Sequence, residues 1–80
     1  MDRASFIKRL IYQSNHRGCK ELDFMLGKFA NLENFIKMTD EQLLLYADFL
    51  NENDWDLYGM MTQKIDSTRY KNIIDLINSN

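Results

Sequence analysis

Proline is absent from the 80 residues of this chain, and glycine occurs only three times. Folds rich in sheet need frequent turns, and glycine and proline are among the residues that turns use most. Because this chain has so few of them, we expect helices joined by short polar loops. The sequence therefore predicts an all-α fold, and its length predicts a single small domain over residues 1–80.

Apolar residues recur with the helical period of three to four along successive segments. The first helix is expected over residues 3–15, after which Gly18 redirects the chain by taking a left-handed backbone conformation. A second helix follows at once and frays between residues 31 and 36. The third begins at Thr39, because Gln42 lies three residues on and completes a capping box.

Two shorter segments complete the pattern. A fourth helix is expected to begin at Asn53 or Asp54, and Ser67 is expected to cap the last one. Leu44 is expected on the inner face of the third helix. Trp55 is expected to fill the core, although a contact surface formed with neighbouring methionines is the open alternative. The prediction is a five-helix domain whose first three helices form the main bundle.

The charges are unevenly distributed along the chain. The net charge is −2, but residues 1–20 hold five basic residues against one acidic, and residues 21–63 hold nine acidic against two basic. A basic face beside an acidic one suits an orienting contact between proteins, although two solvated faces without a special role would look the same. The basic segment lacks aromatic residues at a spacing that reads nucleic acid, so we expect a protein partner and no nucleic acid.

Motifs for catalysis and cofactor binding are missing. The sequence has no glycine-rich phosphate loop, and its one cysteine and one histidine are too few for a structural zinc site. Ser14, His16 and Asp23 are close in sequence, but nothing places them as a triad. We therefore expect a protein that is not an enzyme, with no catalytic residue, no metal site and no stably bound cofactor.

Features that direct a protein to a membrane are also missing. No apolar run approaches the roughly 20 residues that a membrane-spanning helix needs. The apolar residues near the N-terminus are too interrupted for a signal-peptide core, and a single cysteine cannot form an internal disulfide. We expect no membrane insertion, a bacterial cytoplasmic location and a monomer when the protein is free.

The junction around Gly18 departs from local preferences. Arg17 places positive charge near the start of the second helix, where the helix dipole disfavours it. Arg17 and Glu21 are four residues apart in the less favourable order, with the cation toward the N-terminus. Because residues that break local rules often mark functional sites, the junction is a candidate site; two simply exposed charges are the alternative.

The segment 9–23 resembles the signature of the succinate dehydrogenase assembly factors, the flavinator family. The hallmark of that family is an RGxxE motif after a basic and aromatic helix, and Arg17, Gly18 and Glu21 match it. The resemblance continues along the chain, through residues 26–30, a leucine-rich helix at 43–50 and an Asp-x-Asp-Leu pattern at 54–57. The chain departs from the family at Cys19, which is usually methionine, at Trp55, often proline, and at Tyr58 and Gly59, near which a tryptophan is common.

The resemblance implies a five-helix domain that binds the flavoprotein subunit of succinate dehydrogenase, and in some bacteria that of fumarate reductase. It implies that the domain promotes covalent attachment of FAD to a histidine of that subunit. Both FAD and the accepting histidine would then belong to the partner, and the location would be the mitochondrial matrix in a eukaryote. The rival interpretation is a general helical interaction module, such as an antitoxin or a regulatory adaptor.

The resemblance also implies roles for six residues of a partner-binding site. Gly18 would permit close approach of the partner, and Arg17 would offer its planar fork of donors to carboxylates or carbonyls of the partner. Glu21 would act as an acceptor at the interface or would fix Arg17. The residues expected to flank this patch are Arg9, Tyr12 and His16.

Overall fold

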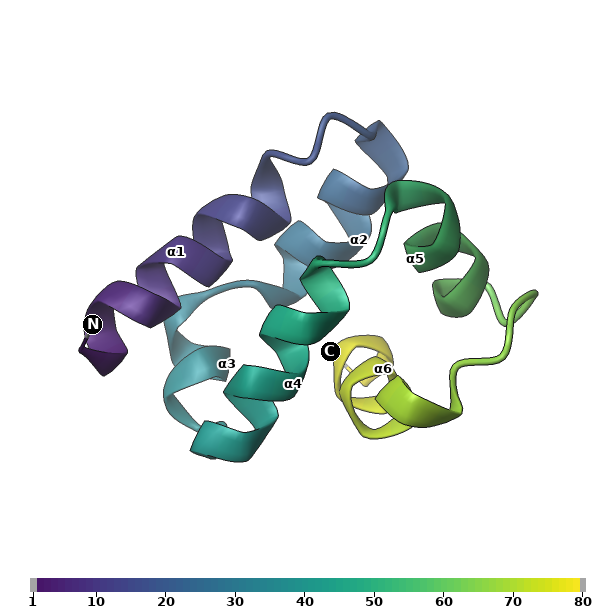
Figure 1. Ribbon diagram of the computed structural model, residues 1–80. Coiled ribbons are helices and arrows are strands. Elements are labelled where there is room, and N and C mark those ends of the chain that lie inside the picture. The colour runs from purple at the N-terminus through teal and green to yellow at the C-terminus, as the bar shows by residue number, and fades with distance from the viewer. Residues whose placement is uncertain (1, 80) are drawn as a thin grey trace.

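The structure, a computed structural model, describes residues 2–79 and confirms the all-α class. The two terminal residues of the predicted domain lie outside the described residues. Over residues 2–79 the chain forms six α-helices, one 3-10 turn and no strand (Figure 1). The elements are α1 (Arg3–Asn15), α2 (Lys20–Phe29), α3 (Leu32–Ile36), α4 (Asp40–Leu50), α5 (Asp54–Met61), η1 (Thr68–Tyr70) and α6 (Lys71–Asn78).

The chain has one helix more than predicted, because the expected fraying after α2 is a break followed by a new helix. The backbone leaves the helical conformation at Ala30. Asn31 is extended, and its side chain accepts a hydrogen bond from the backbone N–H of Asn34 at 2.8 Å, which caps α3. The side chain of Asn34 in turn donates to the carbonyl of Phe29 at 2.8 Å and so satisfies the end of α2.

Apolar periodicity and local capping signals predicted several helix ends correctly. The bounds of α1 agree with the prediction. The capping box of α4 has both of its bonds, from the N–H of Gln42 to the Thr39 hydroxyl at 3.1 Å and from the N–H of Thr39 to the Gln42 side chain at 2.8 Å. Asn53 caps α5 by accepting from the N–H of Asp56 at 2.8 Å.

Three side chains lie differently from the prediction. The side chain of Ser67 makes no capping bond, because Asp66 accepts from the N–H of Thr68 instead. Leu44 is 61% exposed, because the buried face of α4 consists of Leu43, Tyr46, Phe49 and Leu50. Trp55 is 84% exposed, so the expectation that it fills the core is wrong.

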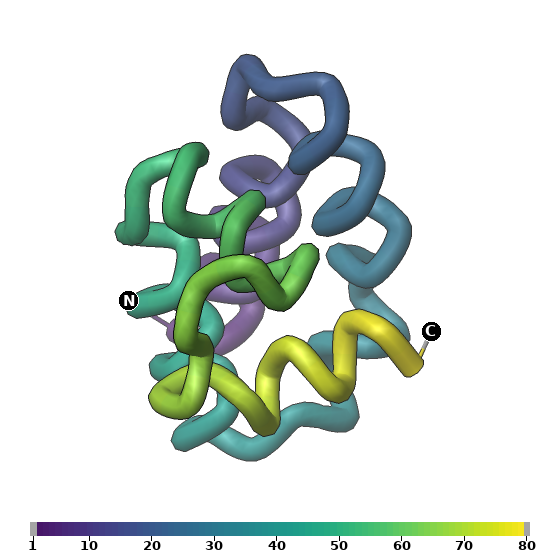
Figure 2. Tube along the Cα trace, turned by 90° about the vertical axis from the view of Figure 1, so that its right-hand side faces the viewer, coloured from purple at the N-terminus to yellow at the C-terminus, as the bar shows by residue number. Residues whose placement is uncertain are grey.

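The helices enclose one cluster of buried side chains. Helix α1 packs against α2, α3 and α4, while α6 contacts α2 and α4, and α5 contacts α2 (Figures 1 and 2). Five aromatic rings from α2, α3, α4 and η1 form a continuous run through this core. They are Phe29, Phe35, Tyr46, Phe49 and Tyr70. Each such pair contributes about 0.5–1.5 kcal/mol beyond the area it buries.

A buried hydrogen bond joins α1 to α4. The Ser14 hydroxyl donates to the carbonyl of Leu10 at 2.7 Å, so the Tyr46 hydroxyl, 2.7 Å away, donates to Ser14. Burial raises the pKa of Tyr46 to about 12, because the phenolate would lose its solvation. This bond fixes the C-terminal half of α1, which leads into the RGxxE segment.

No helix within residues 2–79 combines the length and apolar character needed to cross a membrane.

Candidate functional site

The candidate site is the corner between α1 and α2, formed by residues 16–19. Gly18 takes the predicted left-handed conformation, with φ of 87°. It is exposed, and a Cβ added to it would meet no atom within 4 Å. Other residues adopt this conformation only with strain, so glycine lets the chain turn while leaving open space above the backbone. The corner is therefore at the surface.

Arg17 points into the protein, where its guanidinium binds acceptors of the chain itself, and its contact with a partner stays a prediction. Its side chain is only 14% exposed. The guanidinium donates from Nε to Asp54 Oδ1 at 2.7 Å, from Nη1 to the carbonyl of Leu50 at 2.8 Å and from Nη2 to the carbonyl of Glu52 at 2.9 Å. Leu50 ends α4, where the helix dipole favours a cation. Arg17 therefore ties the corner to the loop between α4 and α5.

Two further contacts hold the corner. The backbone N–H of Arg17 donates to Asp23 Oδ1 at 2.9 Å, which links the turn to the first half of α2. Gly27 of α2 faces the Asn15 side chain of α1, whose oxygen a Cβ at this position would meet. No part in this site was predicted for Asp54, Asp23 or Gly27. Asp54 in particular has no local signal, since it lies 37 residues from Arg17.

Tyr12 and His16 form an exposed pair at the end of α1. Their rings are stacked with centroids 4.1 Å apart, and Tyr12 is 63% exposed. Nδ1 of His16 donates to the carbonyl of Tyr12 at 2.8 Å, which fixes the orientation of the imidazole ring. Both residues line an open cavity of about 300 Å³ with Arg17 and the end of α4.

Glu21 and Arg9 complete the predicted set. Glu21 is exposed in the first turn of α2 and accepts only a weak bond, from Cys19 Sγ at 3.5 Å. It does not fix Arg17, whose donors bind other acceptors. Arg9 is exposed, and its side chain makes no hydrogen bond or ion pair with a residue between 2 and 79. The spacing of Arg9, Tyr12 and His16 puts them on one face of α1 that leads to the corner.

The residues that a triad would need are directed elsewhere. Ser14 is buried against Tyr46, His16 bonds to Tyr12, and Asp23 bonds to the backbone of Arg17. In the part of the chain that the structure describes, no three His, Cys, Asp or Glu side chains gather closely enough to hold a metal ion.

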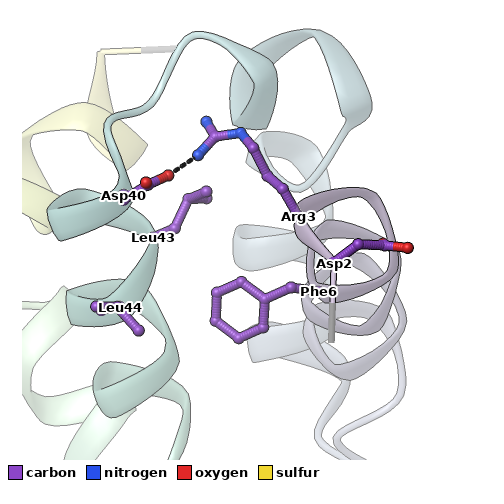
Figure 3. Close-up of a pocket in the computed structure, with 6 residues that line it drawn as sticks. All are labelled: Asp2, Arg3, Phe6, Asp40, Leu43 and Leu44. Atoms are coloured by element: carbon purple, nitrogen blue, oxygen red, sulfur yellow. Dashed lines mark hydrogen bonds and ion pairs between the residues drawn. The ribbon is translucent and has the colours of Figure 1, made fainter.

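A second cavity, of about 420 Å³, opens at the other end of α1. Figure 3 shows Phe6 facing Leu43 and Leu44 across it, with an ion pair between Arg3 and Asp40 at its edge. Arg3 also donates to the carbonyl of Met38 and so joins α1 to the start of α4. None of the predicted site residues lines this cavity.

The fold and the corner define a small all-helical protein that carries an intact RGxxE motif at an exposed turn. A comparison of the sequence with known families gives a match over residues 8–80 to the family described as "Flavinator of succinate dehydrogenase". The chain belongs to this family of succinate dehydrogenase assembly factors.

Curated relatives support the same assignment. The chain is 47% identical over 62 residues to succinate dehydrogenase assembly factor 2, mitochondrial, of Aspergillus terreus, which covers 78% of this chain and 21% of the relative. It is 46% identical over 69 residues to the protein of the same name from Kluyveromyces lactis, which covers 80% of this chain and 41% of the relative. The chain thus spans less than half the length of these relatives. No solved structure matches it significantly.

Proposed function

We propose that this chain binds the flavoprotein subunit of succinate dehydrogenase through the corner and promotes covalent attachment of FAD to that subunit. Membership of the assembly-factor family supports a role in succinate dehydrogenase assembly. The observation that carries the finer proposal is the exposure of Gly18 and Glu21 on a turn that Arg17 and Asp23 hold in place. A surface held before binding loses little conformational entropy when a partner docks.

The proposed docking surface consists of Gly18, Glu21, Tyr12, His16 and Arg9. Without a side chain at Gly18, the backbone of the partner can approach the turn closely. The carboxylate of Glu21 accepts hydrogen bonds from donors of the partner. The stacked rings of Tyr12 and His16 provide a flat aromatic surface for the partner to contact. Arg17 acts on the partner only indirectly, by holding Gly18 in position.

The chain acts in this proposal by binding and supplies no reacting group. FAD and the accepting histidine both belong to the partner, which this chain holds in the conformation where attachment proceeds. Shifting such a conformer from about 1% to 99% of the population requires about 5.5 kcal/mol of differential binding. The chain acts wherever the flavoprotein folds, which the names of the relatives suggest is the mitochondrion.

Reconstitution of flavin attachment tests this proposal. Purified flavoprotein subunit lacking FAD is incubated with FAD and this chain, and covalent flavin is detected by fluorescence of the denatured subunit. We expect the wild-type chain to accelerate attachment, and Gly18→Arg and Glu21→Ala to abolish the effect without changing helix content in circular dichroism. Glu33→Ala, an exposed acidic position on α3, is the matched control. If FAD attachment is accelerated normally by both Gly18→Arg and Glu21→Ala, the proposal is overturned.

A further inference from the structure

Trp55 is the only tryptophan of the chain, and among the large hydrophobic residues between 2 and 79 it is the most exposed. Its neighbours on α5, Leu57, Met60 and Met61, are buried, so the helix is packed normally and Trp55 projects from its outer side. A single exposed apolar residue needs no explanation by itself. The residues around Trp55 are what make its exposure informative.

Trp55 lies beside the corner. The preceding residue, Asp54, binds Nε of Arg17 at 2.7 Å, and Asn53 caps the helix, so the first turn of α5 is fixed. Figures 1 and 2 both show this turn next to the loop between α1 and α2. Tyr58, one turn later on the same side of α5, is also exposed. The docking surface thus continues onto an aromatic edge.

The environment of this edge is acidic. Residues 38–63 contain six acidic residues and no lysine or arginine. Glu52 accepts from the Tyr70 hydroxyl at 2.7 Å, and Asp56 accepts from the Asn53 side chain at 3.1 Å. Arg69 lines the same hollow as these two acids but pairs with Asp48, so neither carboxylate forms an ion pair with a residue between 2 and 79. Trp55 directly precedes Asp56 in the first turn of α5. An exposed tryptophan ring on the same turn as an unpaired carboxylate favours an arginine or lysine side chain, which can stack on the ring and bond to the acid.

We propose that Trp55 is the apolar anchor of the docking surface, and that it receives a basic segment of the flavoprotein partner, with Glu52 and Asp56 beside it. The inference rests on the proposed function, because it takes the flavoprotein as the occupant. Tryptophan residues carry a large share of the binding energy where they occur in interfaces.

The experiment measures binding of the full chain to the purified flavoprotein subunit by calorimetry. We expect Trp55→Ala to raise Kd at least about 10-fold and Trp55→Phe to restore part of the affinity. Leu32→Ala is the matched control, because Leu32 is 54% exposed on α3, away from α5 in Figure 1. It is expected to change Kd by less than about threefold. Fluorotryptophan incorporated at this single position gives one fluorine NMR signal, which should shift on binding.

A second pair of variants tests the basic character of the occupant. Glu52→Gln and Asp56→Asn keep the shape and the internal hydrogen-bond acceptors but remove the charges. Combined, they should raise Kd at low salt and flatten its dependence on salt concentration. An unchanged salt dependence would overturn the basic occupant.

The outcomes separate this inference from the function on which it rests. If the wild-type chain binds and the Trp55→Ala variant binds equally well with an unmoved fluorine signal, the inference fails and the proposed function stands. If the wild-type chain neither binds nor promotes flavin attachment, both fail. If sedimentation shows a dimer of the free chain that Trp55→Ala dissociates, Trp55 contacts a second copy and the inference is overturned.

Discussion

The RGxxE residues divide into two roles in the structure. Arg17 donates three hydrogen bonds within the chain, whereas Gly18 and Glu21 stay at the surface. A motif read as one binding patch therefore combines an internal support with the exposed groups that it positions. Substitutions at Arg17 and at Glu21 should consequently fail for different reasons, the first through stability and the second through binding.

Replacing Arg17 tests the supporting role. We expect Arg17→Ala to lower the free energy of unfolding by about 2–3 kcal/mol, because a carboxylate and two carbonyls lose a charged donor. Arg17→Lys should recover only part of this loss, since an ammonium group lacks the planar fork. Urea unfolding followed by circular dichroism measures both. Arg9→Ala, which removes an exposed arginine of α1, is the control, and an equal effect of both alanine variants would contradict the assignment.

The buried Tyr46 gives a prediction for alkaline pH. Tyr46→Phe should cost about 1 kcal/mol at neutral pH, because the hydrogen bond to Ser14 is lost. The hydroxyl ionises near pH 10 in the unfolded chain and near pH 12 in the folded one. The unfolded chain releases this proton first, so the contribution of Tyr46 is full below pH 10 and falls as the pH rises toward 12.

The measurement is urea unfolding of both proteins between pH 8 and about pH 11. The difference in free energy of unfolding between wild type and Tyr46→Phe should shrink above pH 10. A constant difference would mean that Tyr46 is not shielded from solvent in the folded state.

At the scale of the helices, the hydrogen bonds at helix ends matter more for stability than the lengths of the helices. Helix α3 has only five residues: Asn31 caps its start, and Asn34 within it donates to the carbonyl of Phe29 at the end of α2. A helix this short has little stability of its own, so it depends on its cap and on the burial of Phe35.

Removing the cap of α3 tests this dependence. Asn31→Ala should lower the free energy of unfolding by about 1 kcal/mol, because the N–H of Asn34 loses its acceptor. Urea unfolding measures the change, and amide hydrogen exchange at Asn34 should become faster. Gln13→Ala, at an exposed position within α1, is the control. Unchanged exchange at Asn34 would show that the cap does not hold this helix.

At the scale of the whole molecule, the two cavities that residues of α1 line, one beside Arg3 and one beside Tyr12, open at opposite ends of this helix. The radius of gyration is 11.7 Å, close to the value of about 12 Å for a folded domain of this length. The corner, the paired rings and the first turn of α5 gather at one end, and the cavity beside Arg3 opens at the other. A partner docked on the corner would therefore leave the other end uncovered.

This arrangement predicts a complex of one chain with one flavoprotein subunit, because each chain has a single corner. Light scattering combined with size-exclusion chromatography measures the mass of the complex, to which each bound chain adds 9.6 kDa. A mass increase of two chains per subunit would contradict a single docking surface. Glu21→Ala should shift the mixture toward the separate proteins, and Glu33→Ala should not.

The sequence by itself determined the features that depend on neighbouring residues. The helical period located α1, the pair of Thr39 and Gln42 fixed the start of α4, and Gly18 predicted the left-handed turn. The start of α5 was narrowed to Asn53 or Asp54, and Asn53 is the cap. The RGxxE motif indicated the family, which the comparisons confirmed. The cap at Asn31 was equally local, but it was missed because the apolar period runs on across the break after α2.

Only the tertiary structure decided which way the ambiguous side chains face. Periodicity did not show that Leu44 and Trp55 lie outside, because their exposure depends on where α6 and the corner pack. Periodicity also did not show that the Arg17 side chain donates to Asp54, which lies 37 residues away. Local sequence sets the backbone conformation through short-range hydrogen bonds and sterics, whereas the direction of a side chain on a helix gains meaning only when another helix covers one face of it.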